Sequence, residues 1–545
     1  MSTPVLHTMM HLPLTLETIL QRAEGPVAGV ELVSRRADKT LSRSTWGEVA
    51  RRARKLARAL AQSGVKPGDR VATLMWNHAA HLEAYLGVPL TGAVLHTLNL
   101  RLHPDDIAYI ANDAGDSILL VDEVLLPLFE KFRAAVPFKQ IIVIPCGTAA
   151  HDPHLAAKGF TDYEALLEGA PDAAALPVLH EEDALGMCYS SGTTGRPKGV
   201  IYSHRSTVLH SLVSALPDSL DLSRRDAILL VVPMFHVNAW GLPYSAALVG
   251  ARLLLPGPHL DAESLLDLAE RERATVGAGV PTIWMGIRDF LDAHPERFKL
   301  QQGLRMIVGG SSAPEKLIRD FDRQGLTILH AWGMTETSPI GLVSRLPPET
   351  DSLSESARYA LRAKQGVPPP FIEIRIRNEQ GDVPRDGKTA GELLVRGPWV
   401  AARYHHRDDP SRWTADGYFR TGDIAHIDAM GFVQLTDRVA DMIKSGGEWI
   451  SSVELENALM AHPAVREAAV VAAPHEKWVE RPVAAVVLRA GMSATQEELR
   501  HFIAPHFARF QLPDAIVFVE SIPKTSAGKF KKSELREQFK EWKWH

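Results

Sequence analysis

Tyr189-Ser-Ser-Gly-Thr-Thr-Gly-Arg-Pro-Lys-Gly-Val200 is the stretch that says most about the fold of this chain, and it follows an apolar, strand-like run. Its glycines let the backbone approach an anion closely, and its hydroxyls and Lys198 can donate hydrogen bonds to phosphate oxygens. It does not have the GxxxxGK[ST] spacing of a Walker A loop. An exposed loop of turn-forming residues is the plain alternative. The length of the block and its mixture of hydroxyls with a lysine instead predict a phosphate-binding loop.

Strands and helices alternate on both sides of this loop. Thr45 with Glu48 forms a predicted capping box for a helix that ends near Gly64, and residues 70–75 are then predicted to form a buried strand. The same alternation continues to about residue 333, which implies mostly parallel sheets covered on both faces. Residues 366–435 contain short strands and turns, which predict an antiparallel, barrel-like part.

The length of 545 residues exceeds one typical domain. After Thr436 a charged stretch with two glycines precedes a compact pattern of strands and helices with its own boundaries. We therefore expect an α/β fold with a large N-terminal domain over residues 1–436, made of two mostly parallel α/β sheets and the antiparallel part. A hinge at 437–441 and a small, mobile α+β C-terminal domain at 442–545 would follow.

Bulk properties exclude several classes of protein. A net charge of −5 gives no electrostatic footprint for nucleic acid. The two cysteines, Cys146 and Cys188, do not form a disulfide framework and fit a reducing cytosol. The N-terminus lacks the charged leader and long apolar core of a signal peptide, and the apolar runs are too short to span a bilayer. These features predict a soluble, cytoplasmic protein without a transmembrane segment.

The block SSGTTGRPKG resembles the phosphate loop of the adenylate-forming superfamily, which comprises acyl-CoA synthetases, luciferases and the adenylation domains of peptide synthetases. Further motifs of that family recur in order, so the resemblance covers essentially the whole chain. It implies ATP, Mg²⁺ and coenzyme A as ligands. The implied nucleotide-binding residues are Ser190, Ser191, Gly192, Thr193, Thr194, Gly195, Lys198, Gly310, Ser311, Trp332, Gly333, Met334, Thr335, Asp423 and Arg438.

Residues 330–337, His-Ala-Trp-Gly-Met-Thr-Glu-Thr, resemble the second nucleotide motif of the family. Trp332 offers a flat face on which adenine can stack, and Glu336 offers a hard oxygen ligand for Mg²⁺. The resemblance implies that Thr193 and Glu336 hold the metal together. A buried tryptophan beside a surface glutamate is the alternative without function.

Two shorter motifs complete the predicted nucleotide site. Thr421-Gly-Asp423 resembles the ribose clamp of the family, in which Asp423 would accept hydrogen bonds from both ribose hydroxyls, and Arg438 resembles the second ribose contact. Alone, such a triplet marks an exposed turn. The segment Gly309-Gly-Ser-Ser-Ala-Pro314 follows a strand and opens a helix, and its small residues would leave room for adenine and an acyl chain.

Pro523-Lys-Thr-Ser-Ala-Gly-Lys529 resembles the catalytic lysine motif of the family. A carboxylate that attacks the α-phosphate brings two anions together, so a cation at the reacting oxygens stabilises the transition state. Lys529 is predicted to supply that cation. A solvated basic tail is the alternative, because Lys531 and Lys532 follow directly.

The segment after the hinge resembles the loop that the family presents to the coenzyme A thiol once the small domain has rotated. The family usually has Asp or Lys two residues after the hinge arginine, whereas this chain has Ala440, so we expect retained activity with altered kinetics of rotation. The implied thioesterification residues are Lys444, Gly446, Gly447, Glu448 and Trp449.

Residues 231–240, Val-Val-Pro-Met-Phe-His-Val-Asn-Ala-Trp, resemble the acyl-site segment of medium- and long-chain fatty acyl-CoA synthetases. The resemblance makes Trp240 the gate of the chain tunnel and places His236 where the acyl and thiol paths meet. Considered alone, both residues are more typical of a core than of a ligand site, and the motif match favours the functional interpretation. A fatty chain needs an apolar tunnel, and no arginine or lysine in this segment could pair with a second carboxylate. The predicted catalytic set is Lys529, Glu336, Thr193 and His236.

The sequence therefore predicts an AMP-forming ligase that converts a medium- to long-chain fatty acid to acyl-AMP and then to acyl-CoA. The same group of tryptophan-gated enzymes includes ligases for short thioether acids, so 3-methylthiopropionate remains an alternative. Loading of a carrier protein, luciferase-like oxygenation and a non-catalytic sensor are further alternatives. The absence of an appended carrier domain argues against loading of a carrier protein. The presence of all the reacting groups argues against a non-catalytic sensor. A homodimer is compatible with the resemblance, but no segment specifies an interface.

Overall fold

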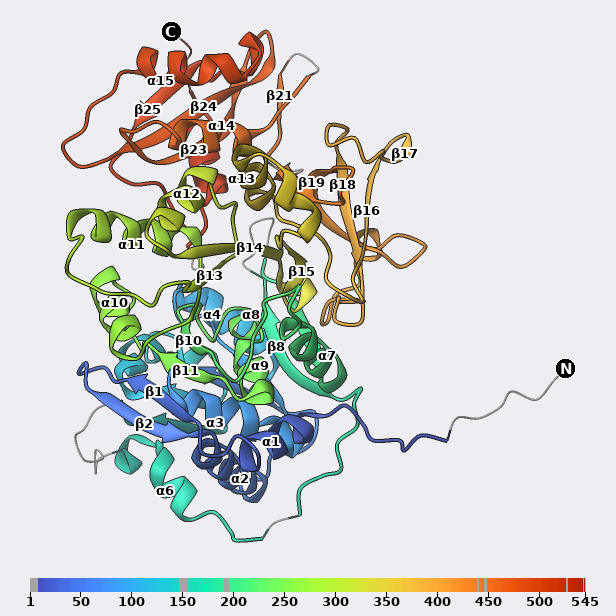
Figure 1. The fold of residues 1–545 in the computed structure, drawn as a ribbon. Helices are drawn as coiled ribbons and strands as arrows, with labels where there is room; N and C mark the ends of the chain where they lie inside the picture. The colour runs from blue at the N-terminus through green and yellow to red at the C-terminus, as the bar shows by residue number, and fades with distance from the viewer. Residues whose placement is uncertain are drawn as a thin grey trace, which may run out of the picture.

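The computed structural model describes residues 8–146, 155–173, 175–190, 196–438, 441–445, 448–525, 528–542 and 544, and at 448 and 449 it describes the backbone. The described chain forms a large body with a small domain of C-terminal residues packed on one end (Figure 1). Two α/β sheets form most of the body, and an antiparallel sheet stands at its side. The α/β fold predicted from the sequence is confirmed.

The first sheet has seven strands in the order β7-β6-β5-β3-β4-β8-β9. All neighbours are parallel except β8 and β9, which are antiparallel and flank the phosphate-loop segment. The bounds are β3 Arg70–Leu74, β4 Val94–Thr97, β5 Asp116–Asp122, β6 Gln140–Ile144, β7 Thr161–Asp162, β8 Ala184–Tyr189 and β9 Gly199–Ser203.

The second sheet has eight strands in the order β15-β14-β13-β12-β10-β11-β1-β2, with antiparallel pairing only at its two ends. One large hydrophobic core contains residues of both sheets and of the helices between them. The bounds are β1 Glu31–Arg35, β2 Leu41–Thr45, β10 Ala227–Leu230, β11 Arg252–Leu255, β12 Val276–Gly279, β13 Arg305–Val308, β14 Thr327–Gly333 and β15 Ile340–Val343.

The helices of the body begin where the sequence provides caps. The predicted capping box of Thr45 and Glu48 is formed, and it opens α2. Asp261 caps the start of α10, where its side chain accepts a hydrogen bond from the backbone N–H of Ser264. The bounds are α1 Leu16–Glu24, α2 Trp46–Gln62, α3 Ala79–Gly87, α4 Pro104–Ala114, α5 Leu126–Phe129, α6 Tyr163–Glu168, α7 His204–Ser214, α8 Val237–Trp240, α9 Leu242–Val249, α10 Ala262–Arg271, α11 Pro281–Ala293, α12 Glu315–Arg323 and α13 Glu355–Ala363.

The antiparallel part is a five-stranded sheet in the order β17-β16-β18-β19-β20, where the sequence predicted short strands and turns. Its last two strands bring Asp423 opposite Arg438, the two predicted ribose contacts. The bounds are β16 Glu373–Asn378, β17 Gly381–Asp382, β18 Gly391–Arg396, β19 Phe419–Ile427 and β20 Val433–Arg438.

The C-terminal residues build a sheet of their own, β22-β21-β24-β23, with β25 paired to β24. Two hydrophobic clusters that contain only residues from Ile443 onward pack against it, so this part has its own core. Ser451 and Thr495 cap the starts of α14 and α15. The bounds are β21 Ile443–Ser445, β22 Glu448–Ile450, β23 Val465–His475, β24 Val479–Leu488, β25 Ala515–Phe518, α14 Ser452–Met460, α15 Gln496–Ile503 and α16 Lys532–Gln538.

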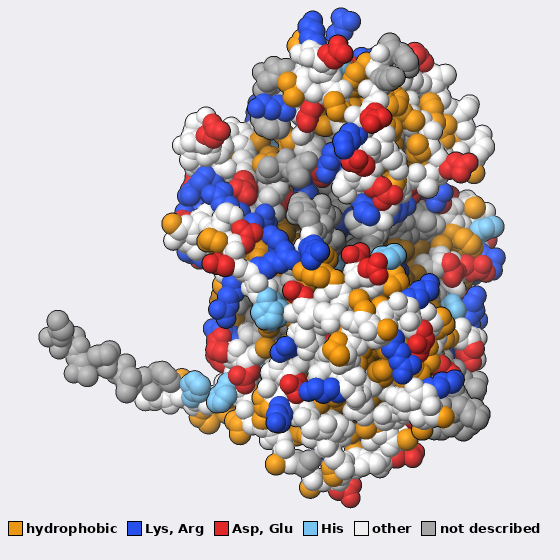
Figure 2. Space-filling model, turned by 180° about the vertical axis from the view of Figure 1, so that it is seen from behind, with side chains coloured by type: hydrophobic (Ala, Val, Ile, Leu, Met, Phe, Trp, Pro, Cys, Tyr) orange, Lys and Arg blue, Asp and Glu red, His pale blue; other side chains and the backbone are white. Residues whose placement is uncertain are grey.

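The surface carries no dominant charge on the face seen from behind. Basic and acidic side chains are interspersed there over both the body and the small domain (Figure 2). This mixture agrees with the small net charge of −5. None of the described helices combines the length and the apolar character that crossing a membrane would require.

Candidate active site

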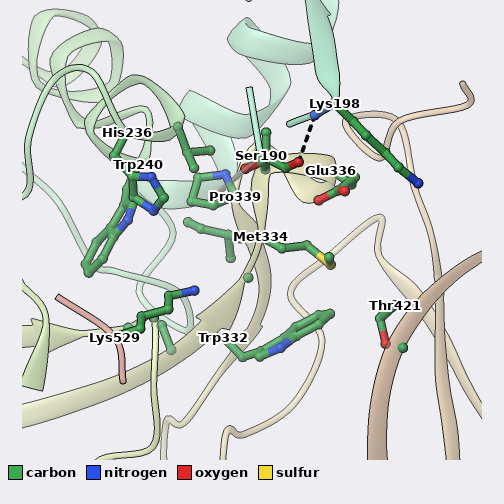
Figure 3. Close-up of a pocket in the computed structure, with 18 of the residues that line it drawn as sticks. Ser190, Lys198, His236, Trp240, Trp332, Met334, Glu336, Pro339, Thr421 and Lys529 are labelled. Carbon is green, nitrogen blue, oxygen red and sulfur yellow. Dashed lines mark hydrogen bonds between the residues drawn. The ribbon is translucent and has the colours of Figure 1, made fainter. Parts of the chain in front are cut away.

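A cavity of about 350 Å³ lies at the carboxyl ends of β10, β13 and β14, where the C-terminal domain meets the body. Crevices at the carboxyl ends of parallel strands are the usual ligand sites of α/β proteins. Figure 3 shows side chains from distant parts of the sequence pointing into it. The predicted site residues that line it are Ser190, Lys198, His236, Trp240, Gly310, Trp332, Gly333, Met334, Thr335, Glu336, Arg438 and Lys529.

A second cavity of about 210 Å³ adjoins the first and extends between the two domains. It shares Gly310, Trp332, Arg438 and Lys529 with the first cavity, and it adds the predicted residues Ser311 and Asp423. Every described residue of the predicted nucleotide site therefore lines one of two adjoining cavities.

Asp423 is held from two sides. The indole Nε1 of Trp332 donates a hydrogen bond to Oδ2 of Asp423 over 2.9 Å, and Nε of Arg438 lies 3.2 Å from Oδ1. Pairing of β19 with β20 sets Asp423 opposite Arg438, and the adjacent Asp423 raises the pKa of Arg438. The carboxylate is buried. It is thus oriented by a neutral donor and by a permanent cation.

Trp332 has a role that the sequence did not reveal. Its ring packs on Gly341, where an added Cβ would lie 2.4 Å from Cζ3 of the indole. Only glycine fits under this ring, and the indole edge is used by the hydrogen bond to Asp423. The prediction for Trp332 concerned only its flat face. The pairing could not be predicted because the two residues meet only once β14 and β19 have packed together.

Glu336 lies on the opposite side of the cavity from Trp332 and is only 5% exposed. The hydroxyl of Tyr404 donates a hydrogen bond to its Oε1 over 2.7 Å, and burial together with Glu336 raises the pKa of Tyr404. The carboxylate therefore meets a neutral donor and no cation within this contact. An anionic oxygen ligand that lines the cavity in this way fits Mg²⁺, the metal predicted from the sequence.

Lys198 lies between Tyr404 and an acidic residue. Its Nζ lies 3.1 Å from Oδ2 of Asp409 and 4.7 Å from the ring centroid of Tyr404. The backbone N–H of Lys198 donates to Oγ of Ser190 over 3.1 Å, which closes the base of the phosphate-loop segment (Figure 3). Sequence reasoning missed Tyr404 and Asp409, and the polar run of residues 404–409 between β18 and β19 was the available signal.

Lys529 reaches the cavity from the C-terminal domain. Burial, and next the nearby Arg438, lower the pKa of Lys529 to about 8, while Asp423 and Glu336 act in the opposite direction. Its Cε would lie 3.2 Å from a Cβ added at Gly310, which has a φ of +90°. The lysine therefore passes close over a backbone that only glycine adopts readily.

Trp240 ends a turn of left-handed backbone. The φ angles are 46° at Val237, 49° at Asn238 and Ala239, and 58° at Trp240, and Gly241 follows at 71°. Such a run of residues other than glycine is costly and persists only where packing enforces it. The turn projects the indole of Trp240 toward the cavity beside His236 (Figure 3).

The walls around Trp240 are apolar. A Cβ added at Gly309 would lie 3.3 Å from the indole ring of Trp240, so any larger residue there would press on the ring. Burial lowers the pKa of His236 to about 3, with a further contribution from Lys529, so this imidazole is neutral at physiological pH. The apolar side chains of this end are Leu220, Val237, Ile307, Pro339 and Ile340.

Several predicted residues fall outside the described part of the chain. These are Ser191, Gly192, Thr193, Thr194 and Gly195 of the loop, Ala440 of the hinge, Gly446 and Gly447, and the side chains of Glu448 and Trp449. Lys444 is exposed on β21, where its backbone N–H donates to Glu480 over 2.9 Å. Among the described residues no group of three or more His, Cys, Asp or Glu side chains could hold a metal by itself.

Similar proteins share this organisation. Residues 23–405 match the family model of AMP-binding enzymes, and residues 454–529 match that of the AMP-binding enzyme C-terminal domain. Among solved structures, one of an anthranilate CoA ligase in complex with anthranoyl-AMP superposes on this chain with a TM-score of 0.85. The two sequences are 26% identical, and the match covers 97% of this chain and 98% of that one.

Curated relatives match over nearly their whole length. A long-chain-fatty-acid–CoA ligase of Thermus thermophilus is 50% identical over 98% of this chain and 97% of its own. A medium-chain-fatty-acid–CoA ligase of Ectopseudomonas oleovorans is 44% identical over 98% of each chain. A 3-methylmercaptopropionyl-CoA ligase of Ruegeria pomeroyi is 42% identical over 98% of this chain and 99% of its own. The chain belongs to the AMP-binding enzyme family and is an AMP-forming acid–CoA ligase.

Proposed function

We propose that this ligase activates a medium- to long-chain fatty acid. The observation that carries the proposal is the division of the cavity into a charged end, with Lys198, Glu336, Arg438 and Lys529, and an apolar end around Trp240. Such a division fits an acid with one carboxylate and an extended apolar chain. The 50% identity to a long-chain and the 44% identity to a medium-chain fatty-acid ligase support the same substrate class.

In the first half-reaction the substrate carboxylate attacks the α-phosphorus of ATP. A bond forms between a carboxylate oxygen and phosphorus, the bond to the β-phosphate oxygen breaks, and pyrophosphate leaves. Lys529, in its protonated form, would stabilise the negative charge on the reacting oxygens. Glu336 with Thr193 would hold Mg²⁺, which would neutralise phosphate charge when bound. Lys198 would bind the phosphates that depart.

The nucleotide would be fixed by its ribose. Asp423 accepts hydrogen bonds from Trp332 and lies beside Arg438, so its remaining acceptor capacity can bind ribose hydroxyls in one orientation. Adenine would then lie at the strand end formed by Gly310, Ser311 and Trp332–Thr335. This arrangement would set the α-phosphate between Glu336 and Lys529.

In the second half-reaction the coenzyme A thiolate attacks the acyl carbon of the mixed anhydride and AMP leaves. We infer that residues 442–545 rotate about a hinge at 437–441, which removes Lys529 and presents the loop with Lys444, Gly446, Gly447, Glu448 and Trp449. Neutral His236, where the acyl and thiol paths meet, adds no charge that would attract a stray anion. No protein nucleophile is required, and the reaction suits a cytoplasmic enzyme.

A short thioether acid is the second candidate, because a 3-methylmercaptopropionyl-CoA ligase is 42% identical to this chain. The two candidates differ in how far the chain extends past Trp240. Each substrate methylene buried there stabilises the bound transition state by about 0.8 kcal/mol, which raises kcat/KM about fourfold, until the end of the tunnel is reached.

The test is AMP release with ATP, Mg²⁺ and CoA across straight-chain acids from propionate to palmitate, with 3-methylthiopropionate alongside. We expect kcat/KM to rise with chain length and to reach its maximum at hexanoate or a longer acid. A maximum at propionate or 3-methylthiopropionate would move the enzyme to the thioether-acid substrates and leave the mechanism intact. No turnover with any of these acids would refute the proposed substrate class.

A further inference from the structure

A buried cluster of charges lies between the two domains, in the wall of the second cavity, which Lys529 also lines. Nζ of Lys532 lies 2.7 Å from Oε1 of Glu456 and donates to Oγ of Ser452 over 2.6 Å. The hydroxyl and the backbone N–H of Ser452 both donate to Oδ2 of Asp437, each over 2.6 Å. All four residues are at most 9% exposed. The cluster therefore has one cation for two carboxylates.

The two carboxylates belong to different domains. Asp437 lies on β20, where it pairs with Ile424 of the five-stranded sheet, so it is fixed to the body. Glu456 lies on α14 and accepts a hydrogen bond from the backbone N–H of Val470 on β23 over 2.7 Å, so it is fixed to the C-terminal core. Ser452, which bonds Asp437, is the first residue of α14. Rotation about 437–441 would separate Asp437 from its partners.

Lys532 is also linked mechanically to Lys529. The segment between them is closed by backbone hydrogen bonds from Thr525 N–H to the Lys529 carbonyl over 2.6 Å and from Lys531 N–H to the Pro523 carbonyl over 2.8 Å. Lys532 begins α16 directly after this turn. Anchoring Lys532 at the domain boundary therefore limits how far Lys529 can move from the cavity.

We propose that Lys532 is a positioning residue for adenylation, which holds Lys529 in the cavity by neutralising Asp437 and Glu456 across the domain boundary. The inference rests on the proposed function. Without the ammonium, two buried carboxylates on opposite domains repel one another, and the repulsion opens the boundary. The arrangement that forms the adenylate would lose stability, whereas the rotated arrangement, in which Asp437 is separated from Glu456, would not.

The test measures the two half-reactions separately in the full-length enzyme. Adenylation is followed by exchange of labelled pyrophosphate into ATP with the best acid, and thioester formation by CoA-dependent consumption of synthetic acyl-AMP. We expect Lys532→Met to slow adenylation at least tenfold and to change thioester formation less than twofold. Lys532→Arg, which keeps the cation, should retain most of the adenylation rate.

Two further variants isolate the charge. Lys532→Met combined with Glu456→Gln removes the repulsion together with the cation, so adenylation should recover at least threefold over Lys532→Met alone. Lys531→Met is the matched control, because its ammonium is half exposed and pairs only loosely with Glu534, at 3.4 Å. We expect both half-reactions of this control to equal those of the unchanged enzyme.

Equal losses in both half-reactions, or no loss in either, would overturn the proposal, as would a double variant no faster than Lys532→Met. Limited proteolysis of the substrate-free protein gives a readout that does not depend on activity. Faster cleavage near residues 437–450 is expected in Lys532→Met and not in Lys531→Met, and equal cleavage in both would contradict the proposal. If the unmodified enzyme catalysed neither half-reaction, the proposed function would be refuted instead. The proteolysis experiment would then still test whether Lys532 stabilises the contact between the domains.

Discussion

At the scale of single residues, the site is a set of charges that each have a defined neighbour. Asp423 is oriented by Trp332 and Arg438, Glu336 by Tyr404, and Lys198 by Asp409. Lys529 differs from the others, because burial and a nearby arginine make its charge costly. A cation that is poorly solvated gains most when an anion arrives beside it.

The low pKa of Lys529 predicts the pH dependence of adenylation. The side chain loses its proton as the pH rises past about 8, so kcat/KM for ATP should fall about tenfold per pH unit above that value. Lys529→Arg, whose charge persists, should be slower and should lack this descending limb. Thioester formation from synthetic acyl-AMP is the internal control and should not show the limb. A limb that survives in Lys529→Arg would assign the titration to another group.

Trp332→Phe tests the orientation of Asp423. Loss of a hydrogen bond to a charged acceptor costs about 1.5 kcal/mol, so kcat/KM for ATP should fall about tenfold with little change in KM for the acid. The fall in kcat/KM caused by Trp332→Phe should be smaller with 2′-deoxy-ATP, which lacks one of the hydroxyls that Asp423 would bind.

Trp46→Phe is the matched control for this change. Trp46 is buried in the core and donates its own indole hydrogen bond to the Ala251 carbonyl over 2.9 Å. It should alter stability without altering KM for ATP. An equal penalty for ATP and 2′-deoxy-ATP in Trp332→Phe would show that the indole acts on adenine rather than through Asp423.

At the scale of helices, strands and turns, the sequence predicted the structure correctly where a feature depends only on residues close together in the chain. The capping box at Thr45 formed as predicted, because it depends on two residues that are three positions apart. The left-handed turn at Val237–Trp240 could not be predicted, because valine and alanine by themselves avoid positive φ. Packing imposes this turn: buried Asn238 accepts a hydrogen bond from Cys188 of β8 over 3.2 Å.

Gly241→Ala tests whether this turn sets the gate. Gly241 has a φ of +71°, and an added Cβ would lie 2.7 Å from Nδ1 of buried His210. We expect the free energy of unfolding to fall by roughly 1–3 kcal/mol, seen as a lower Tm. The dependence of kcat/KM on the chain length of the acid should also change, because Trp240 is the preceding residue.

Gly286→Ala provides the comparison. Gly286 lies inside α11, and a Cβ added there would have nothing within 4 Å. This change should raise stability by about 0.5–1 kcal/mol and leave the chain-length profile as it was. If Gly241→Ala lowered Tm but kept the profile, the turn would be structural without setting the gate.

At the scale of the whole molecule, the candidate active site lies at the boundary between the two domains. Helix α11 of the body touches the C-terminal domain at two places. Near its start, Thr282 donates to the Gly528 carbonyl over 3.4 Å, and farther along, Asp289 pairs with Arg489 over 2.9 Å. The first contact lies beside the loop of Lys529, and the second adds a partly exposed ion pair between the two domains.

Arg489→Gln should shift the balance between the two half-reactions by a small amount. The pair with Asp289 is partly exposed, and such pairs contribute about 0.2–1 kcal/mol, so adenylation should slow by about fivefold at most. Thioester formation should be unchanged. The difference from the unchanged enzyme should disappear in high salt, because salt screens this pair. A defect that persists in high salt would contradict an electrostatic origin.

The same scale shows why the site was only partly predictable. Motifs located Lys529, Asp423 and Arg438, and the fold brings them to adjoining cavities; their roles in catalysis and binding stay predictions. Tyr404 and Asp409 escaped notice because neither belongs to a recognised motif and both reach the site only through the packing of the segment before β19. Pairings between distant segments depend on tertiary packing, which local patterns do not encode.

Lys198 already has a counter-ion before any nucleotide binds, since its ammonium lies beside Asp409. If a triphosphate binds at this loop, as proposed above, it exchanges one anion for another, and the net electrostatic gain is smaller than for a lysine without a counter-ion. The carboxylate of Asp409 would then compete with the phosphates for the same ammonium. In the proposed mechanism it would act as an internal competitor that limits how tightly pyrophosphate is retained, and it would thereby favour release of this product.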